Sequence, residues 1–120
     1  MVTGRPIKKL KSKILIERIF KKSKKIRSGT LILHYLLDEK GQNSIYIGVG
    51  VSKKNLSLAV RRNRVKRQLR ACIGVHHELI LDRFAPGLYM FLFKGKKSVS
   101  SKYLEQELLK LIDLLPTSGT

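Results

Sequence analysis

The chain has 120 residues, of which 26 are Lys or Arg and 8 are Asp or Glu, so its formal net charge is +18. This length fits one domain, and a hydrophobic fraction of 42% can fill a modest core. So large a positive excess points first to a nucleic-acid partner, although an anionic membrane surface would also attract it. No apolar run approaches the roughly 20 residues that span a bilayer, so we expect no membrane-spanning segment.

Cysteine usage and the N-terminus indicate the compartment. The single cysteine, Cys72, excludes an internal disulfide and is interpreted as a small buried hydrophobe in a reducing environment. Residues 1–13 lack the apolar core of a secretory signal. We therefore expect a cytoplasmic protein with one RNA-binding domain over residues 1–120, in which 1–11 form an extended, flexible basic tail and 116–120 a second flexible tail.

The first predicted helix follows this lead-in. Ser12 can cap a helix that runs to about Lys22, in which Ile16, Ile19 and Phe20 are apolar. Eleven of the 26 basic residues lie between Arg5 and Arg27, against one acid, Glu17. This region is therefore one electrostatic footprint for a polyanion.

Two strands are predicted next, over residues 30–37 and 44–51, because both segments alternate and are separated by a polar, Gly-containing loop. We expect them to pair as an antiparallel hairpin. Gly48 and Gly50 share one face of the second strand and leave it bare, so something bulky can approach the backbone there. A packed helix and a bound ligand are equally good explanations.

The most informative segment is 57–73, which predicts an amphipathic helix with Ser57 as its N-cap and Gly74 as its stop. One side of the helix is apolar, with Leu58, Val65, Leu69, Cys72 and Ile73. The opposite side has Asn63, Lys66, Arg67 and Arg70. From Lys53 to Arg70 there are eight basic residues and no acid, whereas a solvated helix normally mixes charges of both signs. This helix is therefore predicted to bind a polyanion.

The C-terminal part completes the predicted core. Residues 75–85 are ambiguous and can continue a helix beyond a kink at Gly74. Residues 88–93 fit a strand buried on both faces, 94–97 a basic turn, and a helix opened by Ser100 or Ser101 follows. Its apolar side comprises Tyr103, Leu104, Leu108, Leu111, Ile112 and Leu115. Together these elements predict a single-domain α+β sandwich with helices packed on a sheet.

No constellation for protein catalysis can be assembled. His34 stands alone, His76 and His77 point in different directions, and Glu105 and Glu107 do not face each other on a helix. We therefore expect no catalytic residue and no metal site in the protein. Binding is better supported, because Arg and Lys at helical spacing neutralise phosphates, and Asn63 suits a sugar hydroxyl or a base edge, unless it caps a neighbouring loop. Phe20 and Tyr35 are candidates for stacking on single-stranded bases, although the pattern alone favours a place in the core.

The basic segment resembles a known family, the protein component of bacterial ribonuclease P. Members carry a Val-Ser-Lys-Lys segment and then Ala-Val-Lys-Arg-Asn-Arg, Val or Ile, Lys-Arg, followed by Leu or Ile and a further Arg. The matching residues here are Val51, Ser52, Lys53, Lys54, Ala59, Val60, Arg61, Arg62, Asn63, Arg64, Val65, Lys66, Arg67, Leu69 and Arg70. With the flanking helices and strands, the resemblance spans nearly the whole chain.

The resemblance implies a small mixed sheet with elements in the order α-β-β-β-α-β-α and a left-handed crossover through the basic helix, against the usual preference. It implies a subunit that assists a catalytic RNA in removing the 5′ leader from precursor tRNA, with Mg²⁺ bound chiefly by that RNA and none held tightly by the protein. The RNA-binding residues would be Lys53, Lys54, Arg61, Arg62, Asn63, Arg64, Lys66, Arg67 and Arg70. Phe20 and Tyr35 would line a cleft for the leader.

The expected partners are thus the catalytic RNA and precursor tRNA, with no membrane and no required protein partner. The alternative function is a structural RNA-binding protein such as a ribosomal component, which the composition alone allows equally well. A stand-alone nuclease is a weaker alternative, because no acid/base or metal constellation supports it.

Overall fold

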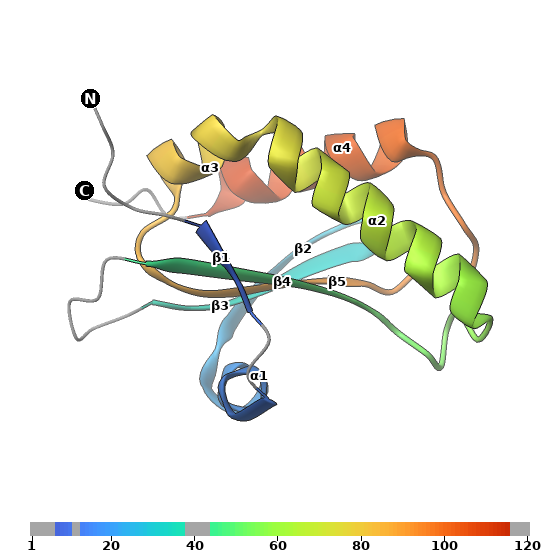
Figure 1. The fold of residues 1–120 in the computed structure, drawn as a ribbon, viewed down its shortest axis with the longest axis horizontal. Coiled ribbons are helices and arrows are strands. Elements are labelled where there is room, and N and C mark those ends of the chain that lie inside the picture. The colour runs from blue at the N-terminus through green and yellow to red at the C-terminus, as the bar shows by residue number, and fades with distance from the viewer. Residues whose placement is uncertain (1–6, 11–12, 38–43, 116–120) are drawn as a thin grey trace.

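The computed structural model describes residues 7–10, 13–37 and 44–115, which form one five-stranded sheet and four helices. In chain order the elements are β1 (Ile7–Lys9), α1 (Lys13–Lys22), β2 (Lys24–Ser28), β3 (Leu31–Leu37), β4 (Ile45–Val51), α2 (Ala59–Val75), α3 (His77–Arg83), β5 (Gly87–Phe93) and α4 (Ser101–Leu114). Helices α2, α3 and α4 cover one face of the sheet and α1 lies against the other (Figure 1). We call these the inner and outer faces.

The strand order is β1-β4-β5-β3-β2, with β5 in the centre. It runs antiparallel to β3 and parallel to β4, and Tyr89 is opposite Tyr35 on one side and Ile47 on the other. The predicted hairpin between residues 30–37 and 44–51 is therefore wrong, because β5 separates the two strands. The predicted strand at 88–93 is confirmed, and its nearly continuous apolar sequence suits this central position.

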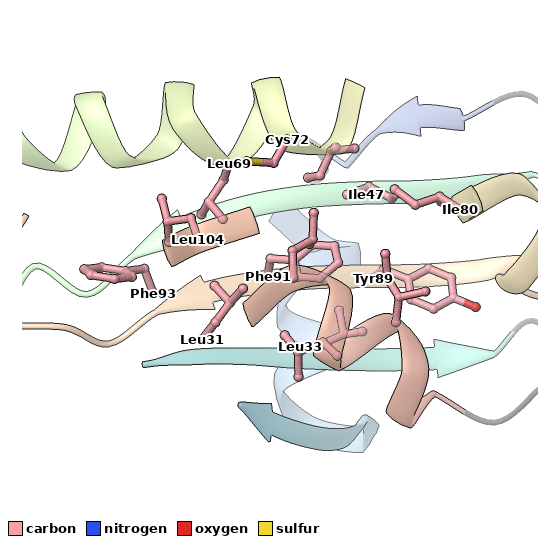
Figure 2. Packing of buried hydrophobic residues seen from close by; sticks show 14 of the residues in the cluster. Leu31, Leu33, Ile47, Leu69, Cys72, Ile80, Tyr89, Phe91, Phe93 and Leu104 are labelled. Carbon is pink, nitrogen blue, oxygen red and sulfur yellow. The ribbon is translucent and has the colours of Figure 1, made fainter. Parts of the chain in front are cut away.

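The main core lies between the inner face and helices α2 and α4 (Figure 2). Leu31, Leu33, Phe91 and Phe93 of the sheet are fully buried, as are several helix residues. The buried residues of α2 are Val65, Leu69, Cys72 and Ile73, as the helical period predicts. Leu58 is the exception, since it precedes the helix and is 55% exposed.

A smaller cluster holds α1 on the outer face. Leu10, Ile19 and Met90 are buried there, with Leu15, Ile16 and Leu92 among the residues packed around them. These side chains also explain the bare face of β4, because a Cβ at Gly48 would lie 2.8 Å from Met90 Sδ and one at Gly50 would lie 2.8 Å from Leu92 Cδ2. The space above these glycines is thus filled by the protein's own side chains.

The N-terminal segment differs from the predicted flexible tail where the structure describes it. Ile7–Lys9 pairs in parallel with β4 as an edge strand, and Leu10 is 6% exposed. Ser12, the predicted loop at 38–43 and the predicted tail at 116–120 lie outside the described residues. The α+β class and the mixed sheet are confirmed.

Strand β2 forms a hairpin with β3 through Gly29 and Thr30. Gly29 has φ of +60°, a left-handed conformation that favours glycine. Helix α4 fastens this turn, because Ser28 Oγ donates to the carboxylate of the buried Glu107 and Thr30 Oγ1 lies 3.0 Å from Tyr103 Oη. The hairpin is therefore held against the inner layer.

The helix ends correct two predictions. Helix α2 begins after Leu58, with no side-chain cap from Ser57, and it runs through Gly74 to Val75 before a break at His76. The ambiguous segment at 75–85 forms the short helix α3. Ser100 caps α4 by accepting from the Tyr103 N–H at 3.1 Å, as predicted.

The observed order contains two elements that the order implied by the resemblance lacks. These are β1, before the helix α1, and α3, after the helix α2. Helices α2 and α3 connect the parallel strands β4 and β5. The left-handed sense of that crossover stays a prediction. Among the described residues, no helix is long and apolar enough to cross a membrane.

Candidate nucleic-acid interface

The first candidate surface is the exposed side of α2 with the turn that precedes it, which we call the cationic face. All the residues predicted to bind RNA lie on these two segments, and those that are exposed are Lys53, Lys54, Arg61, Asn63, Arg64, Arg67 and Arg70. Arg62 and Lys66 are half-buried at its margin. Because Val65 and Leu69 fasten the opposite side to the core, the cationic side is turned to solvent.

Arg62 differs from its neighbours because it has a structural contact. Its Nη1 donates to the Leu56 carbonyl at 3.0 Å and also to the Ser57 carbonyl. These contacts fix the segment that leads into α2. The guanidinium has further donors, so Arg62 can hold this segment and still contact a phosphate.

Within the described part of the chain, the positive charges on α2 are not offset by acidic side chains in its first turn or by ion pairs on its exposed side. Acidic side chains usually occupy a first turn because they offset the positive end of the helix dipole, but the first turn of α2 has Arg61 and Arg62 and no acid. The ion pairs of the described residues are His76–Glu105, Arg83–Asp113 and Lys110–Glu107, and none involves a cation of α2's exposed side. The positive charge of this side is therefore available to bind an anionic partner.

The turn between β5 and α4 adds cations that the predicted set of binding residues did not include. Lys94, Lys96 and Lys97 are exposed there. Their position beside α2 follows from the tertiary fold, and a basic turn at 94–97 was the only signal in the sequence.

The second candidate surface lies on the outer face. Phe20 of α1 is 50% exposed and meets His34 of β3 edge-on, with ring centroids 5.2 Å apart and an interplanar angle of 75°. Lys25 of β2 and Lys94 of the β5–α4 turn lie near His34, and further exposed cations on α1 and β2 include Arg18, Lys21, Lys22 and Arg27. An accessible aromatic ring among cations is the arrangement that single-stranded nucleic acids favour.

Tyr35 is not part of this surface, so its prediction as a leader-binding residue beside Phe20 is wrong. Side chains alternate along a strand, so Tyr35 points to the inner face while His34 points to the outer one. Tyr35 is 6% exposed and stacks on Tyr89, with centroids 6.3 Å apart and planes at 15°. Tyr35 packs in the core, and His34, which the sequence interpretation did not single out, is the β3 residue that meets Phe20 on the outer face.

Two side chains have pKa values displaced by their surroundings. Burial, with the positive charges of Lys25 and Lys94, lowers the pKa of His34, whose Nδ1 lies 3.3 Å from Ser23 Oγ. Burial and then the nearby Glu105 carboxylate raise the pKa of Cys72. A raised pKa disfavours the thiolate, so the Cys72 thiol is a poor nucleophile, in keeping with its predicted place in the core.

The remaining polar groups do not assemble into a metal site. His76 Nε2 lies 2.8 Å from Glu105 Oε2, which joins α2's end to α4. Among the described residues, no group of three or more His, Cys, Asp or Glu side chains is arranged to hold a metal ion.

The fold and these two surfaces define a basic α+β protein of the nucleic-acid-binding class. The chain matches the family described as Ribonuclease P over residues 5–115, and it belongs to that family.

Relatives agree with this assignment. The chain is 34% identical over 67 residues to the ribonuclease P protein component of Staphylococcus carnosus, covering 56% of each chain. It is 35% identical over 72 residues to that of Bacillus velezensis, covering 60% of each. The chain thus spans less than two thirds of the length of these curated relatives.

A solved structure of the Staphylococcus aureus RNase P protein superimposes with a TM-score of 0.74 and 22% identity, covering 88% of this chain and 93% of that one. This similarity establishes the shared fold.

Proposed function

We propose that this chain is the protein subunit of ribonuclease P and assists a catalytic RNA in removing the 5′ leader from precursor tRNA. The observation that carries the proposal is the cationic face of α2, which includes the Arg62-Asn63-Arg64 segment and has no acidic partner among the described residues. Membership of the family supports the choice of this RNA-processing role over a structural role in the ribosome.

In this proposal the two surfaces have different RNA partners. The cationic face binds the catalytic RNA through phosphate contacts, and Arg side chains add forked, bidentate geometry. The outer surface binds the single-stranded leader, with Phe20 stacking on a base and His34 beside it. The sheet lies between the two surfaces, so the protein bridges two RNA segments and reduces their mutual repulsion (Figure 1).

The chemistry belongs to the RNA in this proposal. Mg²⁺ ions bound chiefly by the RNA would supply the attacking hydroxide and stabilise the leaving oxygen. The protein contributes charge and position, and its cations lower the Mg²⁺ concentration that the complex requires. We place this work in the cytoplasm, with no protein partner required.

Reconstitution tests the proposal. Protein and a bacterial ribonuclease P catalytic RNA are mixed at low Mg²⁺, and cleavage of precursor tRNA is followed for the wild type, Arg67→Ala and the control Lys102→Ala. Lys102 is an exposed cation in the first turn of α4 that belongs to neither surface as defined above and does not line the hollow described below. We expect strong stimulation by the wild type and the control and weaker stimulation by Arg67→Ala. Robust cleavage by the purified protein without RNA would contradict the mechanism, and tight binding to ribosomal RNA without stimulation would favour the structural role.

A further inference from the structure

A hollow of about 660 Å³ lies between the N-terminal half of α2 and the β5–α4 turn. Its lining residues are Val60, Arg61, Arg64, Arg67, Lys97 and Ser98. Four of the six carry a positive charge and none is acidic. The two walls are distant in sequence, so the cluster is a product of the fold.

The turn that forms the second wall is fixed at both ends. At its start, Asn55 Nδ2 donates to the Lys94 carbonyl at 2.8 Å, and the Ser52 N–H donates to the Phe93 carbonyl at 3.1 Å. At its end, Gln68 Nε2 donates to the Val99 carbonyl and to Ser101 Oγ, both at 3.1 Å. The backbone on both sides of Lys97 and Ser98 is therefore fixed before a ligand binds, which reduces the entropy cost of ordering this turn.

The first wall presents its charges in a line. Arg61, Arg64 and Arg67 follow a three-residue spacing, so they lie along one side of α2. Over these six residues the helix rises about 9 Å, which is long enough to serve more than one phosphate group. The line begins in the first turn of α2, which has no acidic side chain to offset the positive end of the helix dipole. An anion in the hollow would therefore offset the charge of the arginines and that of the helix dipole.

We propose that this hollow binds the phosphodiester backbone of the partner RNA and that Lys97 is a phosphate-contacting residue of that interface. The inference rests on the proposed function for the identity of the RNA. It extends the binding surface from one helix to a site with two walls, one on α2 and the other on the β5–α4 turn.

The test measures binding affinity against salt for the wild type, Lys97→Ala, Lys97→Glu and the control Lys102→Ala. The probes are a bacterial ribonuclease P catalytic RNA, a short poly(U) RNA and inorganic pyrophosphate. Each lost phosphate contact lowers the slope of log affinity against log salt by about 0.9 on duplex and about 0.7 on single strands. We expect Lys97→Ala to lower the salt slope by one such amount and the affinity by roughly threefold to tenfold. Lys97→Glu should lower both further, and Lys102→Ala should leave both unchanged.

A double-mutant cycle tests whether Lys97 and Arg64 contact the same segment of the RNA backbone. If Lys97 and Arg64 contact the same segment of backbone, the loss in affinity for Lys97→Ala combined with Arg64→Ala should differ from the sum of the single losses, because neighbouring contacts are not additive. Lys97→Ala combined with Arg18→Ala, on the outer surface, should be additive. Thermal melting of each variant checks the fold, and we expect no change because Lys97 is exposed.

The outcomes separate the two proposals. If the wild type binds the catalytic RNA tightly but Lys97→Ala and Lys97→Glu behave like the control, the hollow is not a backbone site and the proposed function stands. If the catalytic RNA binds no better than poly(U), yet Lys97→Ala lowers the salt slope on poly(U), the proposed function fails and the hollow stands. Binding of pyrophosphate that depends on Lys97, without any change in the RNA slopes, would make the hollow a site for small anions and overturn the assignment to RNA.

Discussion

At the scale of single residues, His34 combines an accessible position with an unusual environment. It lies on the outer face between Phe20 and Ser23, where burial and then the positive charges of Lys25 and Lys94 disfavour its protonated form. The folded protein therefore keeps this imidazole neutral at a pH where the unfolded chain protonates it.

This difference predicts a pH-dependent stability. Because the pKa of His34 is lowered in the folded state, the unfolded chain binds more protons between that pKa and about 6.5, so the free energy of unfolding should fall as the pH drops through this window. Urea melts at several pH values, from about 7.5 to about 5.5, would measure the slope. His34→Gln should flatten it, and His77→Gln, at an exposed histidine of α3, should not. An unchanged slope in His34→Gln would contradict the assignment.

Tyr35 and His34 show what single residues in a sequence can and cannot reveal. The alternation of residues 30–37 predicts two faces, and the structure confirms that Leu31, Leu33 and Tyr35 share one of them. Which face is covered depends on where α1, α2 and α4 pack, and a strand pattern contains no such information. Residue type alone therefore favours Tyr35 for stacking, although the half-buried His34 is the residue that faces Phe20.

At the scale of elements, the arginines of α2 differ in whether they face solvent or bind the protein's own backbone. Arg67 lies on the exposed side, whereas Arg62 holds two carbonyls of the segment that precedes the helix. Substitutions at these two residues should therefore differ in what they damage.

We expect Arg67→Ala to weaken RNA binding with little change in stability. Arg62→Ala should weaken binding and also lower the free energy of unfolding by about 1 kcal/mol, because the Leu56 and Ser57 carbonyls lose a charged donor. Chemical denaturation and RNA titrations of both variants, with Lys102→Ala as a control for lost charge, would measure the two effects. Equal stability of the Arg62→Ala and Arg67→Ala proteins would show that the carbonyl contacts contribute nothing.

Elements that depend on local interactions could be predicted from the sequence, whereas strand pairings between distant segments could not. The buried side of α2 could be predicted because the helical period is local, and Ser100 could be predicted as a cap for the same reason. The hairpin between residues 30–37 and 44–51 could not be corrected from the sequence, since the strand that separates them begins at Gly87. The hollow lined by Lys97 depends on that same long-range arrangement.

At the scale of the whole molecule, the sheet separates the two candidate surfaces (Figure 1). The cationic face of α2 lies above the inner layer, and Phe20 lies with α1 on the outer face. Lys94 of the β5–α4 turn lies where the two surfaces adjoin, but Phe20 and Arg67 lie on different elements on opposite sides of the sheet, so their effects on binding should be independent.

This separation predicts additive losses for Phe20→Ala and Arg67→Ala in the binding of precursor tRNA to the reconstituted complex. Phe20→Ala should cost about 1 to 3 kcal/mol, the usual range for stacking on one base, and only when the substrate has a leader. The double variant should match the sum within about 0.5 kcal/mol. Ile14→Ala, at another exposed apolar residue of α1, is the matched control. A strong deviation from additivity would mean that one RNA segment touches both surfaces.

The central position of β5 has a consequence for the order in which the chain can fold. The β2–β3 hairpin is local and can form early, but in the described sheet β4 and β1 join that hairpin through β5, which follows the other four strands in the chain. Until then, β3 and β4 each present an unpaired apolar edge, the kind of surface that promotes aggregation of nascent chains. The same strand that completes the sheet also leads into the turn with Lys97, so the two-walled hollow requires that β5 has joined the sheet.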